Sequence, residues 1–123
     1  MRDREEIEAL LSRYIAACEA RDVAAITACF APRAIVADPT APKARGRAAV
    51  GRYFAALYDD LTELRLATSP LYWQADSVAC RWEGEARRKD GRLIHYEGID
   101  LFDFIDGPLI ARMRAFWDPK DFL

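Results

Sequence analysis

The sequence predicts an α+β fold, with helices in the first half of the chain and an antiparallel sheet in the second. Apolar residues recur at helical spacing up to about residue 61, and strand-like runs follow. Asp90-Gly91 and Asp106-Gly107 are both turn dipeptides of tight hairpins. With 123 residues, of which 52% are hydrophobic, the chain is expected to form a single domain over residues 1–123.

A buried stripe predicts the first helix over about residues 4–20. Its apolar positions follow the i, i+3, i+4, i+7 pattern through Ile7, Leu10, Leu11, Tyr14, Ile15 and Cys18. A short second helix is expected after Asp22, which can cap its first turn, and it should stop before Pro32. Helical spacing returns in "RAAVGRYFAALYDDL", residues 47–61, which predicts the third helix.

Strands are expected between and after these helices. One covers residues 34–38 and ends at Asp38, directly before Pro39, and residues 39–46 form a loop. A strand is expected around residues 64–73, and the two Asp-Gly turns then connect three antiparallel strands as a meander. Helices followed by such a sheet are typical of an α+β domain.

Composition excludes several classes of function. The net charge is −2 and the basic residues are scattered, so neither nucleic acid nor a membrane is an expected partner. The N-terminus has no apolar signal segment, which favours a cytoplasmic location. Cys18, Cys29 and Cys80 lack the spacing of a disulfide framework or a zinc site. His95 is the sole histidine, which excludes a histidine-cluster metal site, and we expect no metal.

Strand parity places one acid on an otherwise apolar face. In the strand after Gly91, Asp100 shares its face with Tyr96, Gly98, Phe102 and Phe104. A carboxyl group buried among aromatic rings without a basic partner should have a raised pKa and stay protonated near neutral pH. Asp100 would then be a hydrogen-bond donor.

Tyr14 and Asp38 complete a candidate catalytic set with Asp100. The Tyr14 phenol lies on the buried stripe, and two donors aimed at one point form an oxyanion hole. Asp38, at a strand end, would be partly solvated and available as a base. Each residue also has a purely structural interpretation, as a core tyrosine, a turn residue before proline and an edge acid. Lys43 and Arg45 follow Asp38 closely, and solvated loop residues are their simplest interpretation.

Four segments resemble ketosteroid isomerase, in the superfamily that also contains nuclear transport factor 2 and the SnoaL-like polyketide cyclases. They are "SRYIAACEARD", "ACFAPRAIVADP", "RGRAAVGRYFAAL" and "GIDLFDFIDGPLIARMRAFWDP". The resemblance runs from about Ile7 to Asp118. It implies that Tyr14 is the oxyanion tyrosine, Asp38 the general base and Asp100 the protonated aspartic acid.

The resemblance also implies a cone-shaped, cystatin-like fold, in which three helices close a curved, mostly antiparallel sheet around an apolar pocket. A homodimer and a cofactor-independent isomerisation of a hydrophobic ketone are expected from the family. The substrate-binding residues expected from the resemblance and from strand parity are Phe30, Phe54, Trp82, Phe102, Met113 and Trp117.

Two departures from the isomerase pattern bear on the substrate. Phe54 occupies the position where many isomerases have a second tyrosine, with Tyr53 one step aside, and the loop from Asp38 to Gly46 is about one residue shorter. Two alternatives therefore stay open beside the isomerase. One is a polyketide cyclase on the same scaffold, and the other is a non-catalytic domain that carries a small hydrophobic ligand or dimerises.

Overall fold

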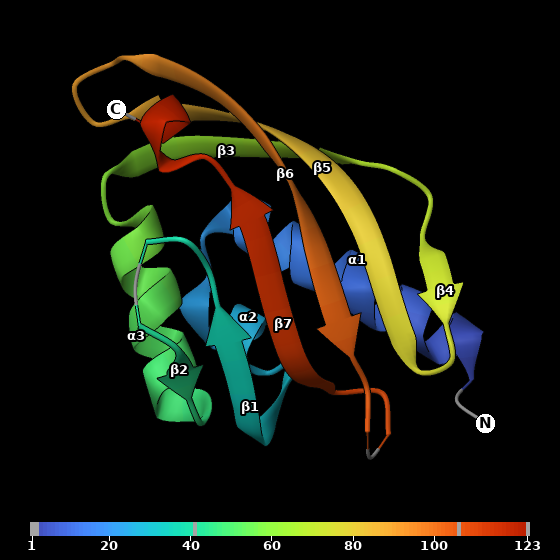
Figure 1. Cartoon of the computed structure of the whole chain (residues 1–123). Helices are drawn as coiled ribbons and strands as arrows, with labels where there is room; N and C mark the ends of the chain where they lie inside the picture. The colour runs from blue at the N-terminus through green and yellow to red at the C-terminus, as the bar shows by residue number, and fades with distance from the viewer. Residues whose placement is uncertain (1–2, 41, 106, 123) are drawn as a thin grey trace.

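Three helices cover one face of a seven-stranded sheet in the computed structural model, which describes residues 3–40, 42–105 and 107–122 (Figure 1). The elements follow one another as α1 (Arg4–Ala20), α2 (Val23–Thr27), β1 (Phe30–Ala37), β2 (Ala44–Arg45), α3 (Arg47–Tyr58), β3 (Leu61–Thr68), β4 (Tyr72–Gln74), β5 (Ser77–Arg88), β6 (Leu93–Asp103), β7 (Ile110–Trp117) and a short 3-10 helix, η1 (Pro119–Phe122). The α+β prediction is confirmed.

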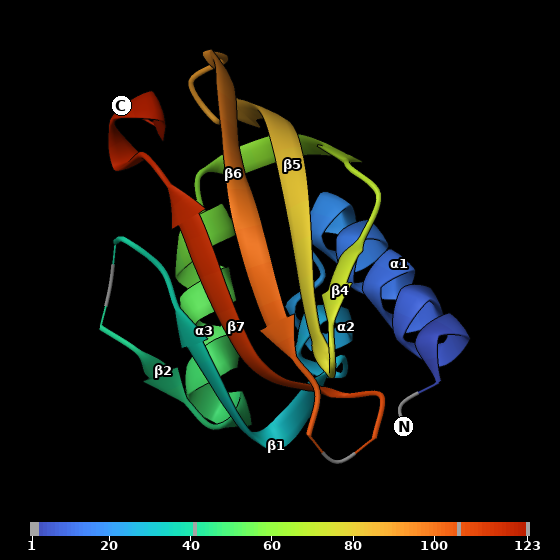
Figure 2. The same ribbon diagram turned by 45° about the vertical axis from the view of Figure 1, so that its right-hand side comes forward.

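The sheet is mixed but mostly antiparallel. Its strand order is β2-β1-β7-β6-β5-β3, and β4 pairs with β5 beside β3. All pairs are antiparallel except β1 with β7, which run parallel. The long strands β5 and β6 bend along their length, so the sheet curves around the helices (Figure 2). This curvature creates an inner, helix-covered face and an outer face.

Local capping explains where the first two helices begin. The Asp3 side chain accepts a hydrogen bond from the Glu5 N–H at 2.9 Å, and Asp22 accepts from the Ala25 N–H at 3.1 Å. Arg21, between the two helices, adopts the left-handed conformation with φ 54° and ends α1. The predicted stripe of α1 is buried except for Ile15, which is half-buried.

Tertiary pairing moves the boundary between α2 and β1. The second helix was expected to continue almost to Pro32, but it ends at Thr27 and β1 begins at Phe30. Phe30 pairs with Ile110 of β7 and its side chain is fully buried, so sheet pairing outweighs the local helical spacing. The register shifts between Phe30 and Ile35, which accommodates Pro32 in the strand.

Proline also divides the strand that was expected over residues 64–73. The structure has β3 up to Thr68, a break at Pro70 and the separate strand β4. Pro70 has no N–H for a ladder hydrogen bond, and β4 instead pairs back onto β5. Helix α3 likewise ends at Tyr58 rather than residue 61, since Leu61 starts β3.

Glycine adopts positive φ at both predicted turns, but the connection between β6 and β7, residues 104–109, is longer than a tight hairpin turn. Gly91 has φ 91° between β5 and β6, and Gly107 has φ 106° between β6 and β7. Asp106, the other half of the second dipeptide, lies outside the described residues.

The inner face follows the predicted parity. Cys80, Trp82 and Ala86 of β5 are buried, whereas Arg81, Glu83 and Glu85 between them are exposed. The Trp82 ring lies over Gly98 of β6, where a β-carbon would come within 2.7 Å of the indole and 2.3 Å of the Phe116 carbonyl oxygen. Gly98 therefore makes the space in which Trp82 lies flat on the sheet.

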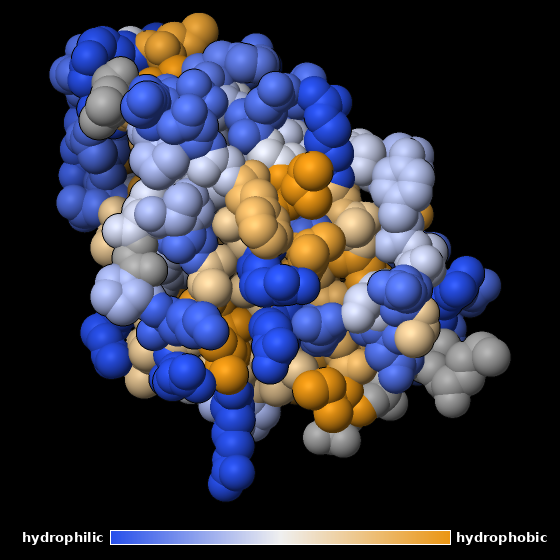
Figure 3. Space-filling model, viewed as in Figure 1, coloured by the Kyte–Doolittle hydropathy of each residue, from blue (hydrophilic) through white to orange (hydrophobic). Residues whose placement is uncertain are grey.

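The outer face of the sheet carries an apolar patch. Ile99 of β6 and Phe116 of β7 are paired in register, and 46% and 51% of their surfaces are exposed. Figure 3 shows hydrophobic side chains gathered over this part of the sheet, with hydrophilic ones around them.

Replacing Gly98 with alanine should destabilise the fold, because the new methyl group meets backbone and indole atoms at less than contact distance. We expect Gly98→Ala to lower the free energy of unfolding in urea by roughly 1–3 kcal/mol. Glu97→Ala, which removes an exposed ion pair with Arg81 from the adjacent position, should cost less than about 1 kcal/mol. Equal stability of the two variants would contradict the packing described for Trp82.

Candidate active site

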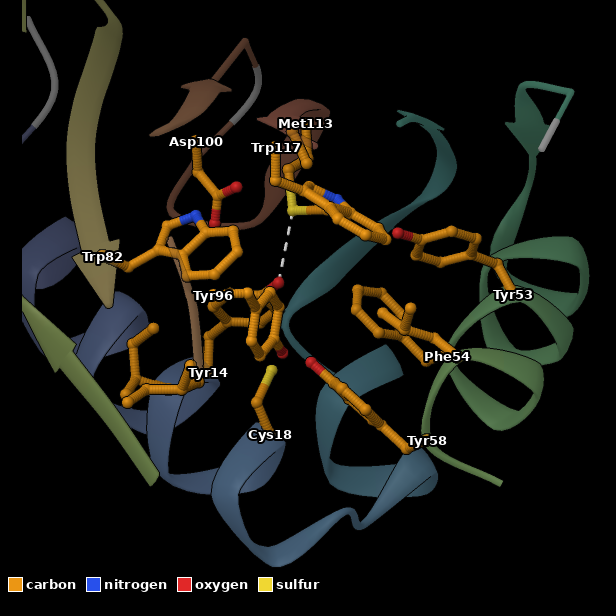
Figure 4. A pocket seen from close by; sticks show the side chains of 14 residues that line it. Tyr14, Cys18, Tyr53, Phe54, Tyr58, Trp82, Tyr96, Asp100, Met113 and Trp117 are labelled. Carbon is orange, nitrogen blue, oxygen red and sulfur yellow. Dashed lines mark hydrogen bonds between the residues drawn. The ribbon is translucent and has the colours of Figure 1, made fainter. Parts of the chain in front are cut away.

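A cavity lies between α1, α3 and the inner face of the sheet (Figure 4). It contains about 480 Å³ of empty space, including the part that opens to solvent. Aromatic and aliphatic side chains make up most of its wall. The lining residues are Tyr14, Ile15, Cys18, Tyr53, Phe54, Leu57, Tyr58, Leu66, Trp82, Tyr96, Asp100, Met113, Ala115 and Trp117.

Asp100 is the only buried charged residue in the part of the chain that the structure describes. It lies in the middle of β6, between Cys80 of β5 and Ala115 of β7, and its side chain points into the cavity. No ion pair joins it to a basic side chain among residues 3–40, 42–105 and 107–122. Burial therefore raises the pKa of Asp100 to about 7.

The indole of Trp82 is the polar neighbour of this carboxyl group. Burial is the larger influence on the pKa of Asp100, and the Trp82 N–H partly offsets it. The two groups face each other in Figure 4, but the contact falls short of hydrogen-bond geometry. Within the described residues, Trp82 Nε1 and Asp100 Oδ1 are both buried without a hydrogen-bond partner. Such unpaired atoms are costly, and a bound ligand could satisfy them.

Tyr14 brings a phenol to the same cavity from α1. Its ring makes edge-to-face contacts with Phe30, Phe54 and Phe102, at centroid distances of 5.8, 6.1 and 5.7 Å. Its hydroxyl donates to the Met113 sulfur at 3.2 Å. A thioether is a weak acceptor, so a better one entering the cavity could take over this donor.

Three further phenols line the cavity, and all are kept protonated. Burial is the main cause of the raised pKa values of Tyr53, Tyr58 and Tyr96, as it is for Tyr14. Burial also raises the pKa of the Cys18 thiol to about 12. The cavity thus presents neutral hydroxyl groups on an apolar wall.

Asp38 lies at the rim, immediately after β1, and is half-buried. Its Oδ1 accepts from the Thr40 N–H and hydroxyl, both at 2.8 Å, and its Oδ2 accepts from the Tyr53 hydroxyl at 2.5 Å. Asp38 therefore has a structural role at the end of β1. The turn that its side chain forms with Thr40 holds the carboxylate against α3. Asp38 is not itself among the residues that line the cavity.

The structure brings together most of the predicted site residues. Tyr14, Asp100, Phe54, Trp82, Met113 and Trp117 all line the cavity. Phe30 and Phe102 do not line it; both contact the Tyr14 ring edge-to-face, and Phe102 lines the second cavity described below. Lys43 and Arg45 are exposed and outside the cavity, in agreement with the solvated interpretation.

Sequence reasoning missed Tyr53, Tyr58 and Cys18 as cavity residues. Tyr58 is five residues beyond Tyr53 on α3, which is more than one helical turn, so no simple i, i+4 pattern pointed to them. Cys18 was placed on the buried stripe, but the stripe alone did not distinguish core positions from cavity positions.

A second, more open cavity lies on the other side of the same wall. It runs between α1 and the β3–β4 connection and contains about 1300 Å³, including space open to solvent. Tyr14, Ile15, Trp82 and Asp100 line both cavities. Asp100 therefore lies between the first, narrow cavity and this second, wider one.

No group of three or more potential metal ligands occurs among the described residues. None of the described helices is long and apolar enough to cross a membrane.

Residues 11–113 match the family model of the SnoaL-like domain. The chain is a SnoaL-like domain. It is also 32% identical over 118 residues to a steroid Δ-isomerase of Nocardioides simplex, an alignment that covers 94% of this chain and 93% of that protein. The family resemblance predicted from the sequence is confirmed.

Solved structures of similar shape show the same fold. The epoxide hydrolase/cyclase-like enzyme SalBIII, with a role in pyran ring formation in the polyether salinomycin, superimposes on this SnoaL-like domain with a TM-score of 0.83, 24% identity and coverage of 98% and 97% of the two chains. A ketosteroid isomerase-like protein from Erwinia carotovora atroseptica has a TM-score of 0.72 and 19% identity, over 90% and 92% of the chains.

The raised pKa of Asp100 predicts a pH-dependent stability. The folded state binds the proton more tightly than the unfolded state, so stability falls as pH rises from about 4 to about 7. Asp100→Asn removes this loss. Relative to the wild type, the variant should gain up to about 4 kcal/mol in the free energy of unfolding between about pH 4 and pH 8.

Urea unfolding at several pH values measures this difference. Asp59→Asn, at an exposed aspartate, is the matched control and should follow the wild type at every pH. If the stabilities of the wild type and of Asp100→Asn change in parallel across this pH range, burial does not hold Asp100 neutral.

Proposed function

We propose that this SnoaL-like domain is a cofactor-independent isomerase that moves a C=C bond of a hydrophobic, enolisable ketone into conjugation. The observation that carries the proposal is the pair of buried groups, the Tyr14 phenol and the Asp100 carboxyl group, at one apolar cavity with the acceptor Asp38 at its rim. The similarity to a steroid Δ-isomerase supports this class of reaction.

Tyr14 and Asp100 act as the oxyanion hole. When a proton leaves the carbon α to the carbonyl group, negative charge develops on the carbonyl oxygen. The Tyr14 hydroxyl exchanges its weak Met113 acceptor for this oxygen, and protonated Asp100 donates a second hydrogen bond. Both donors lie in a water-poor environment, where their interaction with the developing charge is strongest.

Asp38 is the proton acceptor and later the proton donor. It takes the α proton as the C–H electron pair moves into the dienolate, and it returns a proton to the γ carbon. One proton changes position and the substrate neither gains nor loses electrons, so the reaction as written needs no redox partner.

Two features favour catalysis over a passive carrier or dimerisation domain. Asp100 has no basic partner among the described residues, so its burial is not explained by an ion pair. Asp38 is held by Thr40 and Tyr53 instead of pointing freely into solvent. A polyketide-type cyclisation needs the same enolate stabilisation, and the structural similarity to SalBIII makes it the second candidate.

We infer that the protein forms a homodimer through the outer face of its sheet. Ile99 and Phe116 form an exposed apolar pair on that face (Figure 3), and Leu101 of β6 points the same way. If this patch packs on the same patch of a second protomer about a twofold axis, Ile99 and Phe116 of both protomers become buried.

Loss of the acceptor should abolish most activity. We expect Asp38→Asn to lower kcat for a Δ5-3-ketosteroid by more than about a hundredfold, since proton transfer by a positioned group contributes that much or more. Tyr14→Phe should cost roughly 3 kcal/mol of barrier, about a hundredfold, by removing one oxyanion donor. The rise of the ultraviolet band of the conjugated ketone measures the rate.

Tyr72→Phe, which removes an exposed phenol outside both cavities, is the control and should keep the wild-type rate. Wild-type turnover that survives in Asp38→Asn would exclude Asp38 as the acceptor. If the wild type is inactive on the steroid, and a polyketide β-ketone but not the steroid raises its melting temperature, the cyclase is the better assignment.

The dimer is tested by a charge on the outer face. Phe116→Glu should shift the protein from dimer to monomer in sedimentation velocity, because the carboxylate would be buried against its own copy. Leu93→Glu, an exposed apolar residue near a hairpin end, should leave the dimer intact. A wild type that sediments as a monomer at micromolar concentration would contradict the interface.

A further inference from the structure

The geometry points to Tyr53 as a proton relay between Asp38 and a ligand in the cavity. This inference rests on the proposed function and specifies the route by which the proton reaches Asp38. The phenol oxygen, not the carboxylate, is the atom that meets the substrate, and Asp38 acts through it.

The first observation is which group reaches the cavity. Tyr53 lines it, and Asp38 does not. The Tyr53 ring projects from α3 with its hydroxyl turned toward Trp117 on the opposite wall (Figure 4). The same hydroxyl donates to Asp38 Oδ2 at 2.5 Å, so the phenol oxygen connects the acid to the cavity.

The second observation is that the Asp38 carboxylate is occupied by donors. Three groups donate to it: the Thr40 N–H to Oδ1, the Tyr53 hydroxyl to Oδ2, and the Thr40 hydroxyl, whose one proton is shared between Oδ1 at 2.8 Å and Oδ2 at 3.1 Å. These donors occupy most of the acceptor capacity of the carboxylate. A relay through Tyr53 uses one of these existing hydrogen bonds.

The third observation is that Tyr53 is fixed and stays protonated. Its ring packs edge-to-face on Phe54 at 4.9 Å. Burial, and then the hydrogen bond to Asp38, raises the pKa of the phenol, so its proton is present to be passed on. The Tyr53 hydroxyl points to the base, Asp38.

The proton balance of the relay closes at each step. In the first step the C–H proton moves to the Tyr53 oxygen while the Tyr53 proton moves to Asp38 Oδ2, and the C–H electron pair forms the dienolate. In the second step the Asp38 proton returns to the Tyr53 oxygen while the Tyr53 proton goes to the γ carbon. Both side chains end in their starting states.

The test compares the two donors to the same carboxylate. We expect Tyr53→Phe to lower kcat for the Δ5-3-ketosteroid by about a hundredfold or more. Thr40→Val also removes a hydroxyl donor to Asp38, but from the solvent side, and it should cost at most about tenfold. The double variant of Asp38→Asn with Tyr53→Phe should be no slower than Asp38→Asn alone, because the two residues act in one chain.

A substitution that preserves the ring guards against a folding defect. Incorporation of 3,5-difluorotyrosine at position 53 changes the acidity of the phenol with little change in shape. The relay predicts a changed kcat and a shifted pH profile, with thermal stability close to that of the wild type.

The outcomes separate the relay from the proposed function. If Tyr53→Phe stays within tenfold of the wild type while Asp38→Asn is inactive, Asp38 acts directly and the relay is wrong. The relay is also wrong if the losses of kcat caused by Tyr53→Phe and by Asp38→Asn multiply in the double variant. If the wild type does not turn over the ketone, or Asp38→Asn keeps its rate, the proposed function itself fails and the relay with it.

Discussion

An uncompensated carboxyl group in the middle of β6 constrains everything around it. Asp100 is shielded from water, has no cation beside it in the described part of the chain, and faces an aromatic cavity. Ionisation in such a place is unfavourable, so the group is held near the point where neutral and charged forms are balanced at physiological pH. Burial favours the neutral form of both donors of the site, this acid and the Tyr14 phenol.

The surrounding packing maintains that condition. The Trp82 indole lies over Gly98 and beside the carboxyl group, and the Tyr14 ring is held by three phenylalanines. These contacts fix the donors before a ligand arrives, which is what electrostatic preorganisation requires. The acceptor, by contrast, lies at the rim, where its carboxyl group accepts hydrogen bonds from Thr40 and Tyr53. The fold thus provides two different environments for two aspartates across one cavity.

Much of this arrangement could be predicted from the sequence. Strand alternation placed Asp100 on the inner face with Trp82 and Phe102, because a regular hairpin with a tight turn leaves little freedom in its register. The helical stripe placed Tyr14 in the same way. Long periodic elements therefore carried reliable information about side-chain direction.

The remaining features depend on contacts between segments that are distant in sequence. The early start of β1 follows from pairing of Phe30 with Ile110, about eighty residues later. The role of Tyr53 depends on the turn at Asp38, which brings the carboxylate to α3. No local sequence pattern indicates that these two side chains are in contact. The family comparison drew attention to position 54 and assigned Tyr53 no role, whereas the structure shows that the Tyr53 hydroxyl reaches the acid.

The protonation state of Asp100 is the central claim, and infrared difference spectroscopy of the wild type against Asp100→Asn measures it directly. A protonated carboxyl group has a C=O stretching band that is separate from the bands of carboxylates. We expect this band to belong to Asp100 at acidic pH and to disappear with a midpoint at about pH 7. Loss of the band with a midpoint near about pH 4, the value of an ordinary aspartate, would contradict it.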